Sequence, residues 1–280
     1  MIAPTPQMLR RIVRRALDED IGRGDVTTQS VIPAEATCGG AIVIRSPGVV
    51  AGLEVARLVF HEVDPGVEFR GKAADGDAAE RGATVAEVAG SARAILTAER
   101  TALNFLQRMS GIATLTRRYV AAVQGTNARI LDTRKTAPGL RCLDKWAVAL
   151  GGGANHRFGL YDGILIKDNH LRIAGGVAPA VAAARRGGPH GLSIQVEVET
   201  VGQAREALDA GADALLLDNM APAEMREIVE LARGRALTEA SGRVKLENVR
   251  AIAASGVDFI SVGALTHSAP ALDIALDISL

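Results

Sequence analysis

The chain has few residues of several kinds, and each shortage excludes a class of protein. It holds only two cysteines, Cys38 and Cys142, at no metal-ligand spacing, so neither a disulfide framework nor a cysteine-rich metal site is expected. Aromatic residues make up 3% of the chain, which argues against the stacking platforms that bind single-stranded nucleic acid. Lysine plus arginine and aspartate plus glutamate balance at 32 each, so the bulk charge predicts no nucleic-acid surface.

Long apolar runs are also missing. No stretch of membrane-spanning length is free of charge, and residues 1–20 contain no signal-peptide core. We therefore expect a soluble, cytoplasmic protein with no membrane partner and no nucleic-acid partner. At 280 residues the chain can form one large domain or two modest ones.

The first part of the chain mixes helix and strand patterns without a regular repeat. Helical spacing of apolar residues predicts helices over 7–20 and 52–63, and short strands are expected at 41–45, 68–72 and 84–89. This mixture predicts an α+β domain of about one hundred residues. A long helical pattern follows over 91–123, in which Ser110-Gly111 is a candidate break.

From residue 129 the chain alternates strand and helix patterns at a spacing of roughly 20 residues, which predicts βαβ units and a parallel sheet. The expected strands are 130–132, 164–166, 194–198, 214–217, 236–239 and 259–262, and the expected helices are 176–186, 201–210, 222–233 and 245–254. Gly211, Gly234 and Gly256 stand just after three of these helices, as C-terminal glycines do. Six strands are too few for a complete eight-stranded barrel, so an incomplete barrel and an open doubly wound sheet both fit the periodicity.

Polar residues gather where these strands end, and this favours the barrel. They include Thr133-Arg134-Lys135, Lys167-Asp168-Asn169, Glu197, Asp218-Asn219, Glu239 to Gly242, and Gly263. In a barrel all the strand ends converge on one rim, where ligands bind. An open sheet instead offers one crevice.

Cationic residues cluster between 129 and 172. Arg134, Lys135, Arg157 and Lys167, together with His156, follow strands or a glycine-rich loop. Arginine binds carboxylates and phosphates through paired hydrogen bonds, and lysine supplies a compact charge. The segment therefore predicts a site for a small polyanion. Gly151 to Gly153 do not form a nucleotide-phosphate loop, because no Gly-Lys-Ser/Thr follows.

Carboxylates and small residues follow the later strands. Glu197 and Asp218 could pair with the cations, bind sugar hydroxyls or hold Mg²⁺ carried by a phosphate substrate, and a structural ion pair remains equally open. Ser241-Gly242 and Gly263 could expose backbone N–H groups to a phosphate or could be ordinary helix-start residues. For His267 a turn cap and a phosphate contact are both open.

These residues form long motifs in order along the chain, and together they resemble the quinolinate phosphoribosyltransferase family. The motifs are Asp132 to Leu140, Gly151 to Arg157, Leu165 to His170, Val196 to Glu199, Leu217 to Asn219, Glu239 to Gly242 and Ile260 to His267. Upstream, Asp20 to Thr28, Ala98 to Asn104 and Ser110-Gly111 are similar too, so the resemblance covers essentially the whole chain. One departure is Arg243, where many members have a small residue or asparagine, so no contact is assigned to it.

The resemblance implies a fold, an activity and an assembly. The implied fold is an N-terminal α/β sandwich domain over 1–110, with a C-terminal tail at about 268–280 packing on it, and an incomplete α/β barrel of six to seven strands over 111–267. The implied activity joins quinolinate to 5-phosphoribosyl 1-pyrophosphate with Mg²⁺, giving nicotinate mononucleotide, pyrophosphate and CO₂ in NAD synthesis. A homodimer, or a larger assembly of dimers, would share its active sites between subunits.

The resemblance also assigns roles to residues by motif. Thr133, Arg134, Lys135, His156, Arg157 and Lys167 would hold the quinolinate carboxylates and the phosphate groups. Arg100 would reach into the partner subunit's site. Glu197 and Asp218 would bind the ribose hydroxyls or hold Mg²⁺ through water, with no direct metal ligand assigned. Ser241, Gly242 and Gly263, with His267, would bind the 5-phosphate. Lys135, Glu197 and Asp218 are the expected catalytic residues.

Two other functions remain as alternatives at this point. One is the ModD-type paralogue of the family, which is linked to molybdate transport. The other is a non-catalytic barrel that binds a phosphorylated ligand. Such a barrel has no need of the paired Glu197 and Asp218 or of a cationic surface large enough for pyrophosphate.

Overall fold

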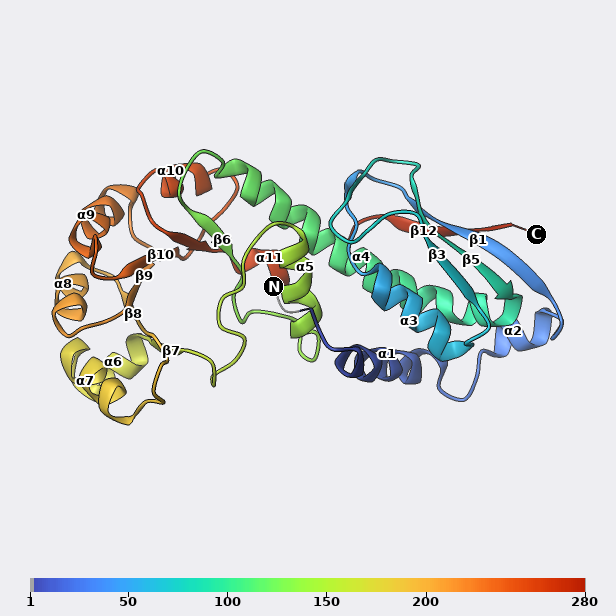
Figure 1. The fold of residues 1–280 in the computed structure, drawn as a ribbon, viewed down its shortest axis with the longest axis horizontal. Helices are drawn as coiled ribbons and strands as arrows, with labels where there is room; N and C mark the ends of the chain where they lie inside the picture. The colour runs from blue at the N-terminus through green and yellow to red at the C-terminus, as the bar shows by residue number, and fades with distance from the viewer. Residues whose placement is uncertain (1–2, 280) are drawn as a thin grey trace. The chain divides into compact units, whose positions relative to one another are not determined.

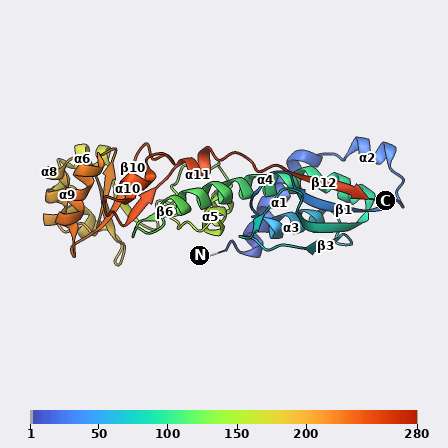
Figure 2. The ribbon, with the colours of Figure 1, turned by 90° about the horizontal axis from the view of Figure 1, so that it is seen from above.

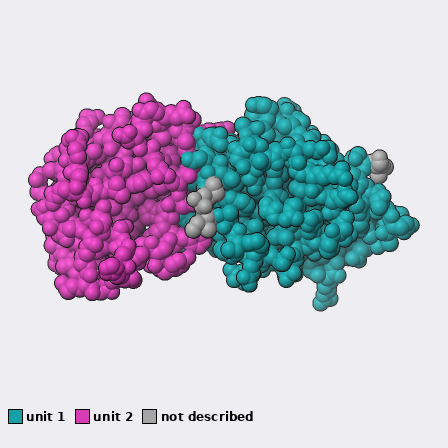
Figure 3. Space-filling view, in the orientation of Figure 1, with its two compact units in different colours: residues 1–117, 136–152, 265–280 teal, residues 118–135, 153–264 magenta. Residues whose placement is uncertain are grey.

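A computed structural model describes residues 3–279, and the chain forms two compact units. The first consists of Met1–Arg117, Thr136–Gly152 and Leu265–Leu280, and the second of Arg118–Lys135 and Gly153–Ala264 (Figure 3). Residues 136–152 thus belong to the first unit, whereas the sequence boundary at 110 places them with the barrel. None of the described helices is long and apolar enough to cross a membrane.

The first unit is built on a four-stranded antiparallel sheet. Its strand order is β12 (Ile274–Ser279), β1 (Thr37–Ile44), β5 (Thr84–Ser91) and β3 (Glu68–Gly71). Helices α3 (Leu53–Val63) and α4 (Ala92–Ala122) lie along one face of this sheet (Figure 1). Helix α1 (Pro6–Ile21) packs on α3, and its apolar stripe buries Leu9, Val13 and Leu17. The expected helices and strands of this half are therefore present.

Smaller elements complete the first unit, and the sequence patterns did not predict them. They are helices α2 (Val26–Val31), α5 (Arg141–Leu150) and α11 (Ala264–His267), and the short pair β2 (Gly48–Val49) and β4 (Ala78–Ala79). The last strand is β12, which runs beside β1 in antiparallel register from Ile44↔Ile274 to Gly39↔Ser279 (Figures 1 and 2). The end of the chain thereby supplies an edge strand to the N-terminal sheet.

Helix α4 continues unbroken through Ser110-Gly111 over 31 residues, so the expectation of a break there is wrong. Ser110 is fully buried, and its hydroxyl accepts the N–H of Ala51 at 2.9 Å. A Cβ on Gly111 would lie 2.1 Å from the carbonyl oxygen of Pro270. The Ser-Gly pair therefore lets two other segments approach the helix closely.

The second unit is a parallel sheet of six strands. The order is β6 (Arg129–Leu131), β11 (Phe259–Ser261), β10 (Leu237–Ser241), β9 (Ala214–Asp218), β8 (Ile194–Val198) and β7 (Ile164–Ile166). The helices between them are α6 (Asp168–Ala174), α7 (Val177–Gly187), α8 (Val201–Asp209), α9 (Pro222–Ala232) and α10 (Val249–Ala253). They lie outside the curved sheet (Figure 1).

This sheet has the order of a barrel that is open at one seam. Each strand from β7 to β11 pairs with the next, and β11 pairs with β6, while β6 and β7 do not pair within residues 3–279. The expected incomplete barrel is confirmed. Gly211, Gly234 and Gly256 have φ angles of 85°, 72° and 95°, as expected for glycines that end helices. The short helix α6 was not predicted.

Candidate active site

The polar residues at the strand ends share one edge of the second unit because all six strands are parallel. On β8 the buried pattern alternates, with Ile194, Val196 and Val198 buried against the outer helices and Gln195 and Glu197 on the other face. That other face is the inside of the barrel, so the sheet presents carboxylates and amides to its interior.

Asp132 joins the end of β6 to the segment that carries His156. Its carboxylate is fully buried and accepts the N–H of His156 at 2.8 Å and the side-chain amide of Asn155 at 2.7 Å. The backbone of Ala154 pairs with Leu131 beside it. The next residues form a tight turn, in which the Thr133 hydroxyl accepts the N–H of Lys135 at 3.0 Å.

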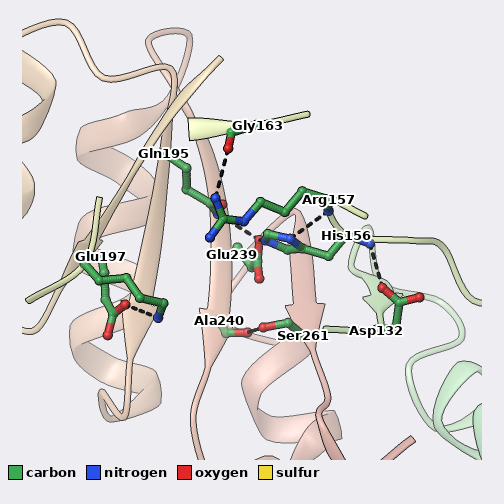
Figure 4. Close-up of polar contacts among 10 residues, drawn as sticks. Asp132, His156, Arg157, Gly163, Gln195, Glu197, Glu239, Ala240 and Ser261 are labelled. Carbon is green, nitrogen blue, oxygen red and sulfur yellow. Dashed lines mark hydrogen bonds and ion pairs between the residues drawn. The ribbon is translucent and has the colours of Figure 1, made fainter. Parts of the chain in front are cut away.

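His156 lies against a buried glutamate inside the barrel (Figure 4). Its Nε2 is 3.3 Å from Oε2 of Glu239, and its Nδ1 accepts the N–H of Arg157 at 2.8 Å. The side-chain amide of Gln195 donates to the same Oε2 at 2.8 Å. Burial alone would raise the pKa of the Glu239 carboxyl, but the contact with His156 and then the hydrogen bond from Gln195 bring it below its usual value.

Arg157 extends from the same segment beside a small cavity. Its Nη1 donates to the carbonyl of Gly163 at 2.9 Å, while its Nε is buried without a hydrogen-bond partner among the described residues. Burial lowers the pKa of this guanidinium, and the positive charge of Arg134 acts in the same direction. The cavity of about 220 Å³ is lined by His156, Arg157, Asp162 and Gln195, with residues of 163–165 and Ser193.

Lys167 and Glu197 form an ion pair at the rim. Lys167 is about half exposed, whereas the Glu197 side chain is largely buried. The N–H of Lys167 donates to Nδ1 of His170 at 2.9 Å, which begins helix α6. His170 therefore has a structural role.

The neighbouring strand ends are joined by Asn219. Its N–H donates to the carbonyl of Ser241 at 3.0 Å, and its side-chain amide donates to Asp218 at 2.7 Å. A Cβ on Gly242 would lie 2.4 Å from the Asn219 side-chain oxygen, and Gly242 has φ of 88°. The loop between Ser241 and Arg243 therefore needs glycine at its centre and keeps its backbone accessible.

Two family models match the chain: "Quinolinate phosphoribosyl transferase, N-terminal domain" over residues 25–110 and the C-terminal domain of the same family over residues 112–277. The chain belongs to the quinolinate phosphoribosyltransferase family. The resemblance found in the motifs is thereby confirmed.

Relatives and solved structures of the family match nearly the whole chain. A probable nicotinate-nucleotide pyrophosphorylase [carboxylating] of Bacillus subtilis (strain 168) is 45% identical over 272 residues, which are 97% of this chain and 94% of that protein. The mitochondrial quinolinate phosphoribosyltransferase [decarboxylating] 2b of Nicotiana tabacum is 43% identical over 96% of this chain and 82% of its own length. The crystal structure of NadC from Streptococcus pyogenes aligns with a TM-score of 0.96 at 38% identity, over 100% of this chain and 99% of that one.

Most of the residues expected from the family motifs lie in the second unit. Arg100 and His267 do not: Arg100 is exposed on α4, and His267 ends α11, where its Nδ1 is 2.6 Å from the Ser268 hydroxyl. Both belong to the first unit. Whether they take part in the site stays a prediction.

Three residues that organise the site were missed from the list of site residues: Asp132, Gln195 and Glu239. Glu239 stood in the motif Glu239 to Gly242 but received no role. Glu239 could have been noticed because it is a charged residue in a predicted strand, and the structure shows that its neighbours Thr238 and Ala240 are buried. A charge buried in such a position lowers the stability of the fold unless other groups pair with it.

Proposed function

We propose that the protein transfers the phosphoribosyl group of 5-phosphoribosyl 1-pyrophosphate to quinolinate and removes one carboxylate as CO₂, giving nicotinate mononucleotide and pyrophosphate for NAD synthesis. The observation that carries the proposal is the guanidinium of Arg157, whose buried Nε has no hydrogen-bond partner among the described residues and whose pKa is lowered by burial and also by the charge of Arg134. Neighbouring cations repel each other, and a bound anion offsets that repulsion. A pyridine dicarboxylate supplies such an anion.

The chemistry suits a site without a nucleophilic side chain. The lone pair of the pyridine nitrogen attacks C1 of the ribose, so no general base is required. The protein has to hold two anionic substrates together and stabilise the cationic ribosyl centre and the departing pyrophosphate. We assign the carboxylates to Arg134, His156 and Arg157, and the pyrophosphate to Lys135 and Lys167. The positive charge of the pyridinium formed in the first step then stabilises the carbanion left on the ring when CO₂ departs, and a proton from solvent completes the C–H bond at that carbon.

Glu197 and Asp218 fit a role toward the ribose and Mg²⁺. Mg²⁺ prefers oxygen ligands and commonly takes one or two carboxylates together with substrate phosphates and water. Glu197 and Asp218 lie at the ends of neighbouring strands β8 and β9, and each has oxygens to offer at the rim. When bound, Mg²⁺ would neutralise charge on the pyrophosphate. These two carboxylates also carry negative charge toward the cationic ribosyl centre.

The 5-phosphate is assigned to the loop after β10 and to Gly263 after β11. Ser241 offers a hydroxyl, and Gly242 has no side chain because a Cβ there would lie 2.4 Å from the Asn219 side-chain oxygen. Backbone N–H groups in such loops bind phosphate without a charged side chain. His267 stays a candidate contact for the same group.

We further propose a homodimer with shared sites, in which Arg100 serves the partner subunit. Arg100 is exposed, and no hydrogen bond or ion pair ties its side chain to any of residues 3–279. A cytoplasmic location fits the two cysteines, both of which are free. Larger assemblies of dimers are compatible with the proposal.

The activity is tested directly. The purified protein is incubated with quinolinate, 5-phosphoribosyl 1-pyrophosphate and Mg²⁺, and nicotinate mononucleotide and ¹⁴CO₂ from carboxyl-labelled quinolinate are measured. We expect both products in equal amounts. Absence of both from folded protein would overturn the assignment.

Sharing of the site is tested by mixing inactive variants. Arg100→Ala and Lys135→Ala are each expected to lose activity, because each removes one charge from an anion site. If Arg100 acts across the dimer, each mixed dimer contains one intact site and one site that lacks both residues. At equal mixing about half of the dimers are mixed, so up to a quarter of the wild-type activity should return. A mixture that stays inactive, with heterodimers shown by mass spectrometry, would place the whole site in one chain.

A further inference from the structure

Glu239 is a buried charge to which the family motifs assign no role. Only 3% of the residue is exposed, and it lies in the middle of β10 with its side chain inside the barrel (Figure 4). One oxygen, Oε1, has no hydrogen-bond partner among the described residues. An ionised carboxylate in such a place costs stability that a leucine would not cost, so its presence points to a functional role.

The other oxygen of Glu239 holds two side chains that come from different parts of the barrel. Oε2 accepts the amide of Gln195 from β8 at 2.8 Å and lies 3.3 Å from Nε2 of His156. The Nδ1 of His156 accepts the N–H of Arg157, so the ring proton of a neutral His156 must sit on Nε2, facing Glu239. The carboxylate therefore fixes both the orientation and the tautomer of the imidazole.

The same contacts hold two of the side chains that line the cavity next to Arg157. His156 and Gln195 both line that cavity, and Glu239 is the group that joins them. Its negative charge also lies in a region that holds the guanidinium of Arg157 and the nearby charge of Arg134. Without Glu239 the imidazole and the amide would lose their common anchor.

We propose that Glu239 is a positioning residue that acts through His156: it holds the imidazole and Gln195 in place so that the cavity beside Arg157 binds a carboxylate of the aromatic substrate. The inference rests on the proposed function and adds to it a residue that contacts no substrate itself. It predicts an effect confined to the dicarboxylate substrate, with the phosphoribosyl substrate unaffected.

A double-mutant cycle tests this. Glu239→Gln keeps the shape of the side chain and removes the charge. We expect it to raise KM for quinolinate tenfold or more while KM for 5-phosphoribosyl 1-pyrophosphate changes less than twofold. In a His156→Ala background the same change is expected to shift KM for quinolinate less than twofold further, because residues that act as a unit are not additive.

A purely structural role gives a different result. It would lower the melting temperature, change both KM values in parallel and add fully to the effect of His156→Ala, and that outcome overturns the inference. The matched control is Asp258→Asn. Asp258 accepts the N–H and hydroxyl of Thr238, which precedes Glu239 in β10, so its loss should reduce stability and leave both KM values unchanged.

A failure of the role proposed for Glu239 can be distinguished from a failure of the proposed function. Wild-type protein is assayed first, and absence of product there rejects the function and not the role of Glu239. The role is then judged from quinolinate binding by calorimetry, in which Glu239→Gln should weaken binding to the same extent as His156→Ala. Active wild type with an unaffected Glu239→Gln variant rejects the positioning role alone.

Discussion

Arg108 and Asp144 form a bidentate ion pair between helices α4 and α5. Nε and Nη2 of Arg108 lie 2.9 and 2.8 Å from the two carboxylate oxygens, and the Asp144 side chain is fully buried. The same carboxylate accepts the N–H of Ala137 at 3.1 Å, and Arg108 also donates to the carbonyl of Thr266. The pair therefore anchors the loop that follows Lys135, together with the start of the C-terminal segment.

Removing one partner of this pair should cost more stability than removing an exposed ion pair. Arg108→Ala leaves a buried carboxylate with too few donors, and we expect the free energy of unfolding to fall by about 3 kcal/mol or more. Urea denaturation measures the change. The control is Arg10→Ala, which removes an exposed arginine and leaves Glu62 paired with Arg14, so it should cost no more than about 1 kcal/mol. Equal losses in the two variants would contradict the importance of burial here.

Two glycines of the triplet after α5 are required by the structure, Gly151 by packing against α4 and Gly152 by its backbone conformation. A Cβ on Gly151 would lie 2.5 Å from the carbonyl oxygen of Ala113 and 2.6 Å from the Cβ of Thr116, and Gly152 has φ of 92°. Arg117 fastens the turn by donating to the Gly151 carbonyl at 3.1 Å. The sequence showed only that the triplet is not a nucleotide-phosphate loop, and the structure explains why glycine stands there.

Gly151→Ala should therefore destabilise the fold by about 1–3 kcal/mol through overpacking. Gly187→Ala is the matched control, because Gly187 ends helix α7 with no atom within 4 Å of an added Cβ and no positive φ. That variant should be neutral or more stable by about 0.5–1 kcal/mol. Thermal melts of the two variants side by side measure the contrast, and a Gly151→Ala protein as stable as the wild type would refute the close approach.

Arg243 occupies a left-handed backbone conformation with φ of 48°, directly after the loop assigned to phosphate. Side chains other than glycine and asparagine are strained there by about 1 kcal/mol or more. We expect Arg243→Asn to raise the free energy of unfolding by about 0.5–1 kcal/mol. Arg243→Gln removes the same charge but keeps the strain, so it should give no gain. A similar gain from both variants would assign the effect to charge.

The sequence predicted the six barrel strands because short apolar runs recur between helical patterns, and it predicted most of the long helices because each buries one apolar face. It could not place the 136–152 segment, because the ion pair between Arg108 and Asp144 that holds α5 to α4 joins residues far apart in the chain. The short helix α2 was missed because Gly22 to Gly24 resembles a loop and six residues show no periodicity.

The residues of the candidate site also fall into two groups, those that the sequence could predict and those that it could not. Arg134, Lys135, Arg157 and Lys167 could be predicted as site residues because charge after an apolar strand or a glycine-rich loop is visible in one sequence, and their roles stay predictions. The role of Glu239 could not be predicted, because a carboxylate inside a barrel and one on its surface look alike until the strands are assembled. Its meaning depends on His156 and Gln195, which are 83 and 44 positions away by their numbers in the chain.

The cap of helix α2 should make the stability of this segment depend on pH. Asp25 begins the helix, and the hydroxyl and N–H of Thr28 hold the pKa of its carboxyl below the ordinary value of 3.8. A carboxyl whose pKa is lowered by folding contributes stability that is complete above its unfolded pKa and is lost as pH falls through its folded pKa. The contribution should therefore be full at pH 7 and should decline below about pH 4.

Hydrogen exchange of the α2 amides measures this contribution in wild type, Asp25→Ala and Asp25→Asn. At pH 7 we expect Asp25→Ala to weaken the protection of α2 by about 1 kcal/mol, since it removes the cap. Asparagine keeps an acceptor for the N–H of Thr28, at 2.9 Å in the wild type, and should lose only a few tenths of a kcal/mol. As the pH falls through the lowered pKa of Asp25, protonation removes its charge, and the wild type should converge on Asp25→Asn. A gap between these two that stays constant down to pH 2.5 would show that the ionised carboxylate is not what stabilises the helix.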